Sequence, residues 1–243
     1  MIRAVFLDAG NTLLRMNYPA IAAELARHGV RTAPGEVERA EWRARVRLDE
    51  TVFAPTAPAT STESRASGDR YVRLLLEALG VADEGIVGAL GEWRRTYNPP
   101  VGPWDLADPR ADAALRLLRG AGVAAAVISN SNGSARSILE RLGLAAHLDF
   151  VIDSFEVGVE KPDLRIFALA LARAAVAPAE AAYVGDLYSV DVRGARAAGL
   201  EAVLLDPGGC WGPRDCPTAP DVLAAVRLLL GGRGLYSGRR TKG

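Results

Sequence analysis

The stretch that decides the fold is Ile2–Leu14, which reads IRAVFLDAGNTLL. Its first half is a short apolar run that ends at one carboxylate, Asp8, and Gly10, Asn11 and Thr12 then turn the chain. This pattern predicts a buried parallel strand with an acid at its carboxyl end. Ligands of open α/β sheets bind at those ends, so Asp8 is a candidate for chemistry, although an isolated acid there more often caps the turn.

The charge balance and the lengths of the apolar runs argue against several kinds of partner and location. The 243 residues carry 29 basic and 29 acidic side chains, so no net charge favours nucleic acid or an anionic membrane as a partner. No apolar run approaches the ~20 residues that cross a bilayer. Asp8 interrupts the N-terminal apolar run before it could form the core of a signal peptide, so we expect a cytoplasmic protein.

The spacing of apolar residues divides the chain into two kinds of segment. One segment predicts only amphipathic helices, at 21–28, 36–48, 71–79 and 86–97, with a loop rich in Ala, Thr, Ser and Pro at 53–67. Beyond residue 108, helices alternate with strands, which are expected at 123–129, 150–152, 181–185 and 202–206. Such alternation implies right-handed crossovers and a parallel sheet.

We therefore predict an α/β protein with a Rossmann-like parallel core and an inserted, all-helical cap. The core is expected in residues 1–14 and 106–232, and the cap in residues 15–105. Residues 233–243 are rich in Gly, Ser and basic side chains and are expected to form a disordered tail.

Two segments place anion-binding groups after predicted strands. The strand at 123–129 ends in Ser129, and Asn130 follows in the sequence VISNSNGS, a pattern that fits an anion-binding helix N-terminus or a plain helix cap. Lys161 begins a helix in GVEKPDLRIF and is one of only two lysines, the other being Lys242 near the end of the chain. Because arginine carries the remaining positive charge, this lysine indicates that a compact ammonium group is needed there.

The next strand end carries two acids, in YVGDLYSVDVRGARAAG. Asp186 follows the predicted strand directly, and Asp191 lies five residues later in the first turn of a helix. Facing Asp8 on an adjacent strand, these acids would repel one another unless a cation compensates. Ligands made only of oxygen suit Mg²⁺, and simple helix capping is the alternative explanation.

These four segments, in this order, resemble the haloacid dehalogenase (HAD) superfamily, and the helical insertion sits where its subfamily I phosphatase-like members carry a cap. The resemblance implies that Asp8 is the nucleophile, which attacks phosphorus to give an aspartyl-phosphate. It implies that Ser129 and Lys161 hold the phosphoryl oxygens and stabilise developing charge.

The same resemblance implies a Mg²⁺ cofactor. Asp8, Asp186 and the main-chain carbonyl of Gly10 would bind the ion, and Asp191 would support the metal or its waters. Asn130 and Asn11 are additional candidates for contact with the substrate.

Gly10 departs from the family pattern. The family's phosphatases usually carry a second aspartate there, which acts as a general acid and then a general base, a role worth about 10²- to 10⁴-fold. Glycine keeps the carbonyl ligand but removes the proton donor, so we expect slow turnover of esters with alkoxide leaving groups and less effect on aryl and acyl phosphates. Whether Asp49, Glu50 or Asp105 supplies a proton from the cap stays open.

The leading interpretation is a Mg²⁺-dependent phosphatase that acts on a small phosphorylated metabolite, as a monomer or homodimer. Phosphonate cleavage would need a cap lysine, and residues 15–105 contain none. A 2-haloacid dehalogenase-like hydrolase is a second alternative, which Asp186 and Asp191 disfavour because its substrate is an anionic carboxylate. A catalytically quiet binding protein with the same fold is the third alternative.

The cap is the least informative part of the sequence. Its arginines are interpreted as solvated helix faces, although any of them could contact an anionic group of a substrate. They include Arg43, Arg45, Arg47, Arg65, Arg70 and Arg73.

Overall fold

A computed structural model describes residues 1–231, so the predicted tail at 233–243 lies outside the described part of the chain. Its main sheet has six strands in the order β5-β4-β1-β6-β7-β8, and every pairing is parallel. The strands are β1 (Ala4–Leu7), β4 (Ala124–Ser129), β5 (Phe150–Asp153), β6 (Ala181–Gly185), β7 (Glu201–Leu205) and β8 (Thr218–Ala219). The predicted α/β fold is confirmed. The edge strand β8 was not predicted, because two residues show no periodicity.

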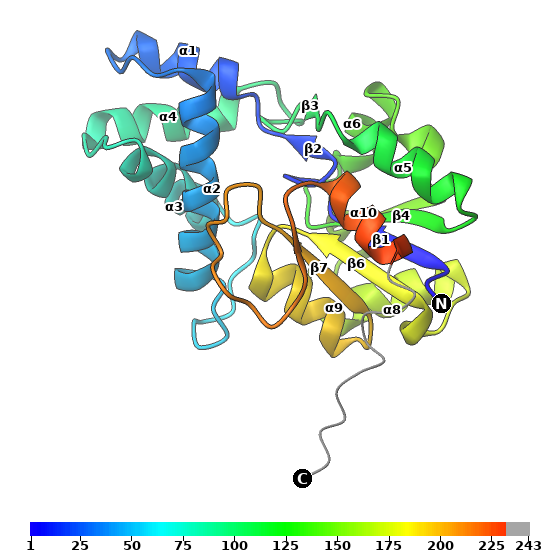
Figure 1. Ribbon diagram of the computed structural model, residues 1–243. Helices are drawn as coiled ribbons and strands as arrows, with labels where there is room; N and C mark the ends of the chain where they lie inside the picture. Colours follow the sequence, from blue (N-terminus) through cyan, green and yellow to red (C-terminus); the bar gives the residue numbers. More distant parts are fainter. Residues whose placement is uncertain (232–243) are drawn as a thin grey trace.

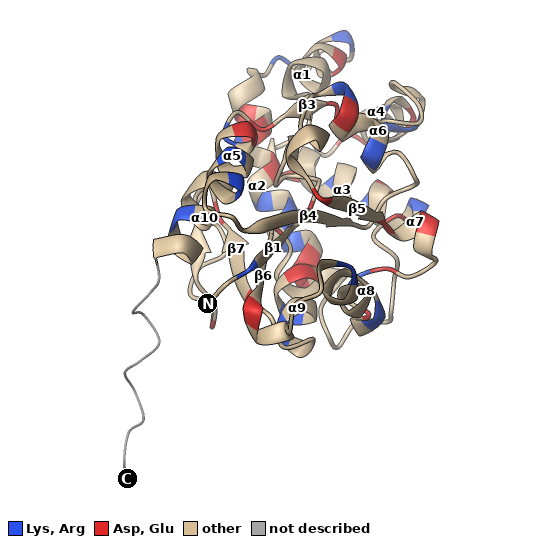
Figure 2. Ribbon diagram, turned by 90° about the vertical axis from the view of Figure 1, so that its right-hand side faces the viewer, with Lys and Arg blue, Asp and Glu red and all other residues tan. Residues whose placement is uncertain are grey.

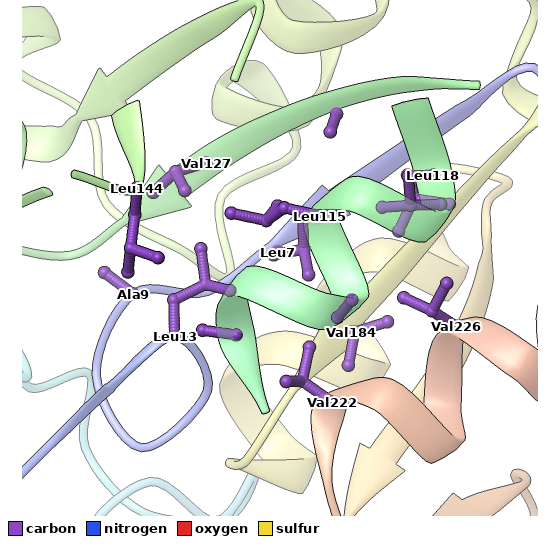
Figure 3. Packing of buried hydrophobic residues seen from close by; sticks show 14 of the residues in the cluster. Leu7, Ala9, Leu13, Leu115, Leu118, Val127, Leu144, Val184, Val222 and Val226 are labelled. Atoms are coloured by element: carbon purple, nitrogen blue, oxygen red, sulfur yellow. The ribbon is translucent and has the colours of Figure 1, made fainter. Parts of the chain in front are cut away.

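Helices cover both faces of this sheet, as Figure 2 shows. On one face lie α5 (Ala111–Gly120), α6 (Ala135–Arg141) and α10 (Val222–Gly231), and on the other lie α8 (Leu164–Ala174) and α9 (Arg193–Ala197). Leu7, Val127 and Val184 from three strands pack against Leu115 and Leu118 of α5 (Figure 3). Burial on both faces explains why the strands read as nearly continuous apolar runs.

The inserted segment forms a separate group of helices beyond the strand tips (Figure 1). It contains α1 (Tyr18–Arg27), α2 (Pro34–Thr51), α3 (Arg65–Ala78) and α4 (Glu84–Thr96), which share their own apolar core. The Ser64 hydroxyl caps α3 by accepting a hydrogen bond from the Ser67 amide, so the helix starts earlier than residue 71, where the sequence pattern placed it. No helix within residues 1–231 is both long and apolar enough to cross a bilayer.

Several short elements escaped the sequence analysis. Where the chain leaves the core and returns, β2 (Leu14–Arg15) pairs with β3 (Leu106–Ala107) in an antiparallel ladder of two residues each. A helical turn, α7 (Ser154–Val157), follows β5. The helix whose first turn was expected to hold Asp191 begins as a π-helical turn, Tyr188–Val192, and continues into α9. Elements this short carry too few residues for a periodic pattern.

One buried contact joins the helical cap to the core. The carboxylate of Asp49, on α2, accepts hydrogen bonds from the Ser189 amide (2.9 Å) and from the Ser189 hydroxyl (2.8 Å). Burial raises the pKa of Asp49 to about 6, while the two hydrogen bonds oppose that shift. Both residues are buried, so neither partner can turn to water if the other is lost.

Replacing Asp49 with alanine should lower the free energy of unfolding by about 1–3 kcal/mol, because the buried amide and hydroxyl of Ser189 lose their acceptor. Urea denaturation measures this change. The neighbouring variant Glu50→Ala is the control: its exposed ion pair with Arg214 should be worth no more than about 1 kcal/mol. Equal stabilities of the two variants would contradict the proposed importance of the Asp49 contact.

Candidate active site

Parallel strands bring the predicted residues to one edge of the sheet. Asp8 follows β1, which lies between β4 and β6, and its amide donates to the Val184 carbonyl at 2.9 Å. Ser129 ends β4, and Asp186 follows β6 directly. Carboxylate oxygens of Asp8, Asp186 and Asp191 all lie within 4.8 Å of one another. The expected approach of these three acids is therefore present in the structure.

Lys161 lies at the centre of this cluster. Its ammonium group donates to Asp8 Oδ1 (2.6 Å), to Asp191 Oδ1 (2.8 Å) and to the Tyr183 hydroxyl (2.7 Å). The Tyr183 hydroxyl in turn donates to the Ile128 carbonyl at 2.9 Å, which fixes its orientation. Burial alone would lower the pKa of Lys161, but the Asp191 and Asp8 carboxylates outweigh it and raise the pKa, so the lysine stays charged.

A second cation reaches the cluster from the cap. Arg45, on α2, is buried and donates from Nη1 to Asp186 Oδ2 at 3.2 Å. Glu41 holds the same guanidinium through bonds of 2.9 Å to Nε and 2.6 Å to Nη2. The interpretation of Arg45 as a solvated residue was wrong, since side-chain exposure is 5% for Arg45 but 77% for Arg65. Burial raises the pKa of Asp186, although the charge of Arg45 opposes the shift.

The repulsion among the three acids is thus compensated by Lys161 and Arg45. The sequence analysis considered only a metal ion for this purpose. It missed Arg45 because the approach of a cap helix to the tip of β6 leaves no local pattern in the sequence.

Asp191 acts as a support for the strand tip. Its Oδ2 accepts hydrogen bonds from the main-chain amides of Asp186 (3.1 Å) and Leu187 (3.0 Å), while its other oxygen holds Lys161. A Cβ atom on Gly185 would lie 2.4 Å from the Asp191 carboxyl carbon, so only glycine leaves room for this arrangement.

The oxygens that remain suit a hard cation. Asp8 Oδ2 and Asp186 Oδ1 accept no hydrogen bond from a side chain within residues 1–231, and the Gly10 carbonyl belongs to the loop that follows Asp8. Two carboxylate oxygens and one carbonyl form a set that Mg²⁺ accepts, with waters or phosphate oxygens completing its shell. The residues present therefore fit the ion that the family resemblance implies.

The two asparagines line the pocket but are bonded to protein. Asn130 donates to Thr62 Oγ1 and to the Lys161 carbonyl, and its oxygen accepts from the Lys161 amide at 2.7 Å. Asn11 donates to Asp186 Oδ2 at 3.0 Å and accepts from the Trp104 indole at 3.1 Å. These bonds hold both side chains at the cavity wall, and their contact with a substrate stays a prediction.

Ser129 is better placed for an anion, because its buried hydroxyl makes only a long contact of 3.3 Å with the neighbouring Asn130 carbonyl. A hydroxyl held this weakly can turn toward a phosphoryl oxygen.

Core and cap together enclose a cavity of about 480 Å³ that contains Asp8, Ser129 and Lys161. The acids considered as proton donors from the cap are absent from its lining. Asp49 is hydrogen-bonded to Ser189, and Glu50 is hydrogen-bonded to Arg214. Asp105 is held by three side chains, those of Asn17, Tyr97 and Asn98.

Among described cap residues, Glu63 is the one acid that lines the cavity, and the sequence analysis did not single it out. It follows Thr62, whose hydroxyl oxygen accepts from Asn130, next to Ser129. Gly10 faces the Trp104 indole, with 3.6 Å between the ring and an added Cβ atom.

An acid at the tip of a parallel strand, beside a buried lysine and beneath a helical cap, defines a capped α/β protein with a charged site at the sheet edge. A family model described as haloacid dehalogenase-like hydrolase matches residues 2–199. The chain belongs to this family.

Curated relatives agree with this assignment. The chain is 34% identical over 235 residues to the human haloacid dehalogenase-like hydrolase domain-containing protein 3, covering 94% of this chain and 92% of that protein. It is 32% identical over 231 residues to a glyceraldehyde 3-phosphate phosphatase of Methanopyrus kandleri, covering 91% and 92%. It is 45% identical over 115 residues to a phosphoserine phosphatase of Thermus thermophilus, covering 47% and 45%.

Solved structures show the same fold. The HAD-hydrolase YfnB of Bacillus subtilis, bound to magnesium, has a TM-score of 0.63 at 16% identity, covering 94% of this chain and 98% of that one. The L-2-haloacid dehalogenase of Xanthobacter autotrophicus has a TM-score of 0.57 at 19% identity, covering 96% and 100%. At these identities the likeness establishes the fold and leaves the reaction open.

Replacing Gly185 with alanine should lower the free energy of unfolding by about 1–3 kcal/mol, because the new methyl group displaces the Asp191 carboxylate. Urea denaturation tests this expectation. Gly88→Ala in α4 is the matched control: its Cβ meets no atom within 4 Å, so alanine should stabilise the helix by up to about 1 kcal/mol. If both variants were stabilised alike, the close packing of Gly185 on Asp191 would be refuted.

Proposed function

We propose that this protein is a Mg²⁺-dependent phosphatase that hydrolyses a small phosphorylated metabolite. The observation that carries the proposal is the position of Asp8 at the tip of β1, with its carboxylate 2.6 Å from the buried Lys161 ammonium and close to Asp186. The phosphatases named among the relatives support the same reaction class.

The proposed chemistry has two displacements at phosphorus. First, an oxygen of Asp8 bonds to phosphorus while the bond to the ester oxygen breaks, so an aspartyl-phosphate forms and the leaving oxygen departs as an anion that takes a proton from solvent. Water then attacks phosphorus, the bond to Asp8 breaks, and inorganic phosphate leaves as a proton passes to solvent. Lys161 and the Ser129 hydroxyl would hold the phosphoryl oxygens and stabilise their charge. Bound Mg²⁺ would reduce the negative charge that these oxygens present to Asp8.

The groups around Asp8 favour phosphorus over carbon as the target. A 2-haloacid would bring its own carboxylate next to Asp186 and Asp191, where a like charge is disfavoured. A phosphoryl group instead suits a site in which free carboxylate oxygens and a carbonyl can share a cation. Dehalogenation is therefore the weaker alternative, although solved dehalogenases have this fold.

Hydrolysis of p-nitrophenyl phosphate and acetyl phosphate should require both Mg²⁺ and Asp8. Asp8→Asn removes the nucleophile, and a chelator removes the ion, so each change should reduce phosphate release to the background rate. Asp112→Asn, an equivalent change on the exposed side of α5, should leave the rate unaltered. Metal-independent release by the wild type, or undiminished release by Asp8→Asn, would refute the proposed mechanism.

Restoring the missing acid should change the choice of leaving group. Gly10→Asp is sterically feasible, because the new Cβ atom would make ordinary contacts of 3.6 Å with Trp104 and 3.9 Å with Asp8. Protonation of the leaving oxygen should raise kcat for an alkyl phosphate such as glycerol phosphate by up to about 10²-fold.

The same variant should change p-nitrophenyl phosphate hydrolysis much less, because a phenolate needs little protonation. Gly10→Asn, of similar size but without an acidic proton, is the control and should give no gain. Equal gains for both variants would refute the account based on proton donation.

A further inference from the structure

One arginine in the cavity has no hydrogen-bond or ion-pair partner within the described residues. Arg94, near the end of α4, is half-buried and lines the cavity, and its guanidinium makes no hydrogen bond or ion pair with residues 1–231. Its Nε atom is fully buried without an acceptor. A buried donor that is left unpaired destabilises the protein, so a site that keeps one calls for an explanation.

The other cap arginines of the cavity are already paired. Arg45 is held by Glu41 and Asp186. Arg95, the neighbour of Arg94 on α4, forms ion pairs with Asp69 at 2.9 Å and with Glu92 at 2.6 Å. The dipole of α4 favours a positive charge near the carboxyl end of the helix. Arg95 already supplies that charge and is fully paired, so the dipole does not explain why Arg94 is unpaired.

The structure also makes space for the Arg94 guanidinium. Gly68, on α3, lies directly beneath it: a Cβ atom at this position would lie 2.2 Å from Arg94 Nη1 and 2.6 Å from Cζ. Any other residue at position 68 would push the guanidinium away. Gly68 itself lines the cavity, so the two helices together hold the charge at its wall.

Glu63 is the acid of the cap that could pair with Arg94 in place of a ligand. It lines the same cavity, but no oxygen of its carboxylate comes within 4.0 Å of Arg94 in the described structure. Burial raises the pKa of Glu63 to about 7, although the charge of Arg94 opposes the shift. Because Glu63 forms no ion pair with Arg94 within residues 1–231, the guanidinium keeps its donors available for a ligand.

We infer that Arg94 is a specificity-determining residue that binds a second anionic group of the substrate, in the same cavity as the phosphoryl site. This inference rests on the proposed phosphatase function and narrows its substrate class. The substrate is a phosphate monoester whose organic part carries a carboxylate or another phosphate. Guanidinium groups suit both, because their planar array of donors matches either anion in a bidentate manner.

Binding to the Asp8→Asn protein in the presence of Mg²⁺ tests the inference without catalysis. Calorimetry would compare propylphosphonate with two analogues of similar length, 3-phosphonopropionate and 1,3-propylenediphosphonate. The second anion should tighten binding about 10- to 100-fold, the factor expected for one hydrogen-bonded charge pair. A preference for one analogue over the other distinguishes a carboxylate from a second phosphate.

Adding Arg94→Met, or Gly68→Ala, to the Asp8→Asn protein should abolish that preference. The matched additions are Arg95→Met, which removes a paired arginine, and Gly88→Ala, which adds a methyl group in open space. Both controls should retain the preference for the second anion. Unfolding curves for every variant would show that the comparison is made on folded proteins.

The possible results distinguish a failure of the proposed role of Arg94 from a failure of the proposed phosphatase function. Equal binding of all three phosphonates, together with Mg²⁺-dependent hydrolysis of aryl phosphates by the wild type, overturns the role of Arg94 and leaves the phosphatase function intact. A preference that survives Arg94→Met also overturns it. If no phosphonate binds and no aryl phosphate is hydrolysed, the proposed function fails and the inference fails with it.

Discussion

The crowding of three carboxylates at the tips of β1 and β6 is the constraint on which the rest of this structure depends. Like charges within 4.8 Å, shielded from water, strongly disfavour simultaneous ionisation unless cations lie beside them. Lys161 supplies one cation from the core and Arg45 supplies another from the cap. The electrostatics of the site therefore involve both parts of the chain, and the cap contributes to the charge balance as well as covering the cavity.

This shared balance links the position of the cap to the state of the acids. Arg45 is anchored by Glu41, which also accepts hydrogen bonds from the hydroxyls of Tyr18 and Tyr71, so a buried polar network fixes the guanidinium. A divalent ion bound at Asp186 would stand next to this guanidinium, and like charges repel. Binding of the ion would therefore weaken the contact between Arg45 and Asp186. By linkage, that contact would weaken ion binding by the same free energy.

The core was predictable because its signals are local. An apolar run that ends in an acid, as at Asp8, already defines a strand, its direction and a chemical group at its tip. Lys161 stood out because lysine is otherwise almost absent from the chain. Arg45, Glu63 and Arg94 were not predicted, because their roles depend on which face of a cap helix or loop meets the cavity. Helical periodicity shows that a face is polar, but not whether water or another part of the protein covers it.

Gly10 shows why binding and proton transfer can be separated in this site. The groups that would hold a phosphoryl group, Ser129 and Lys161, come from β4 and from the loop between α7 and α8, and neither depends on a side chain at position 10. In the proposed reaction, glycine at position 10 removes only the proton donor for the leaving oxygen, whose value depends on how basic that oxygen becomes. The proposal therefore places selectivity for the leaving group at Gly10 and recognition of the remaining substrate at the cap wall of the cavity.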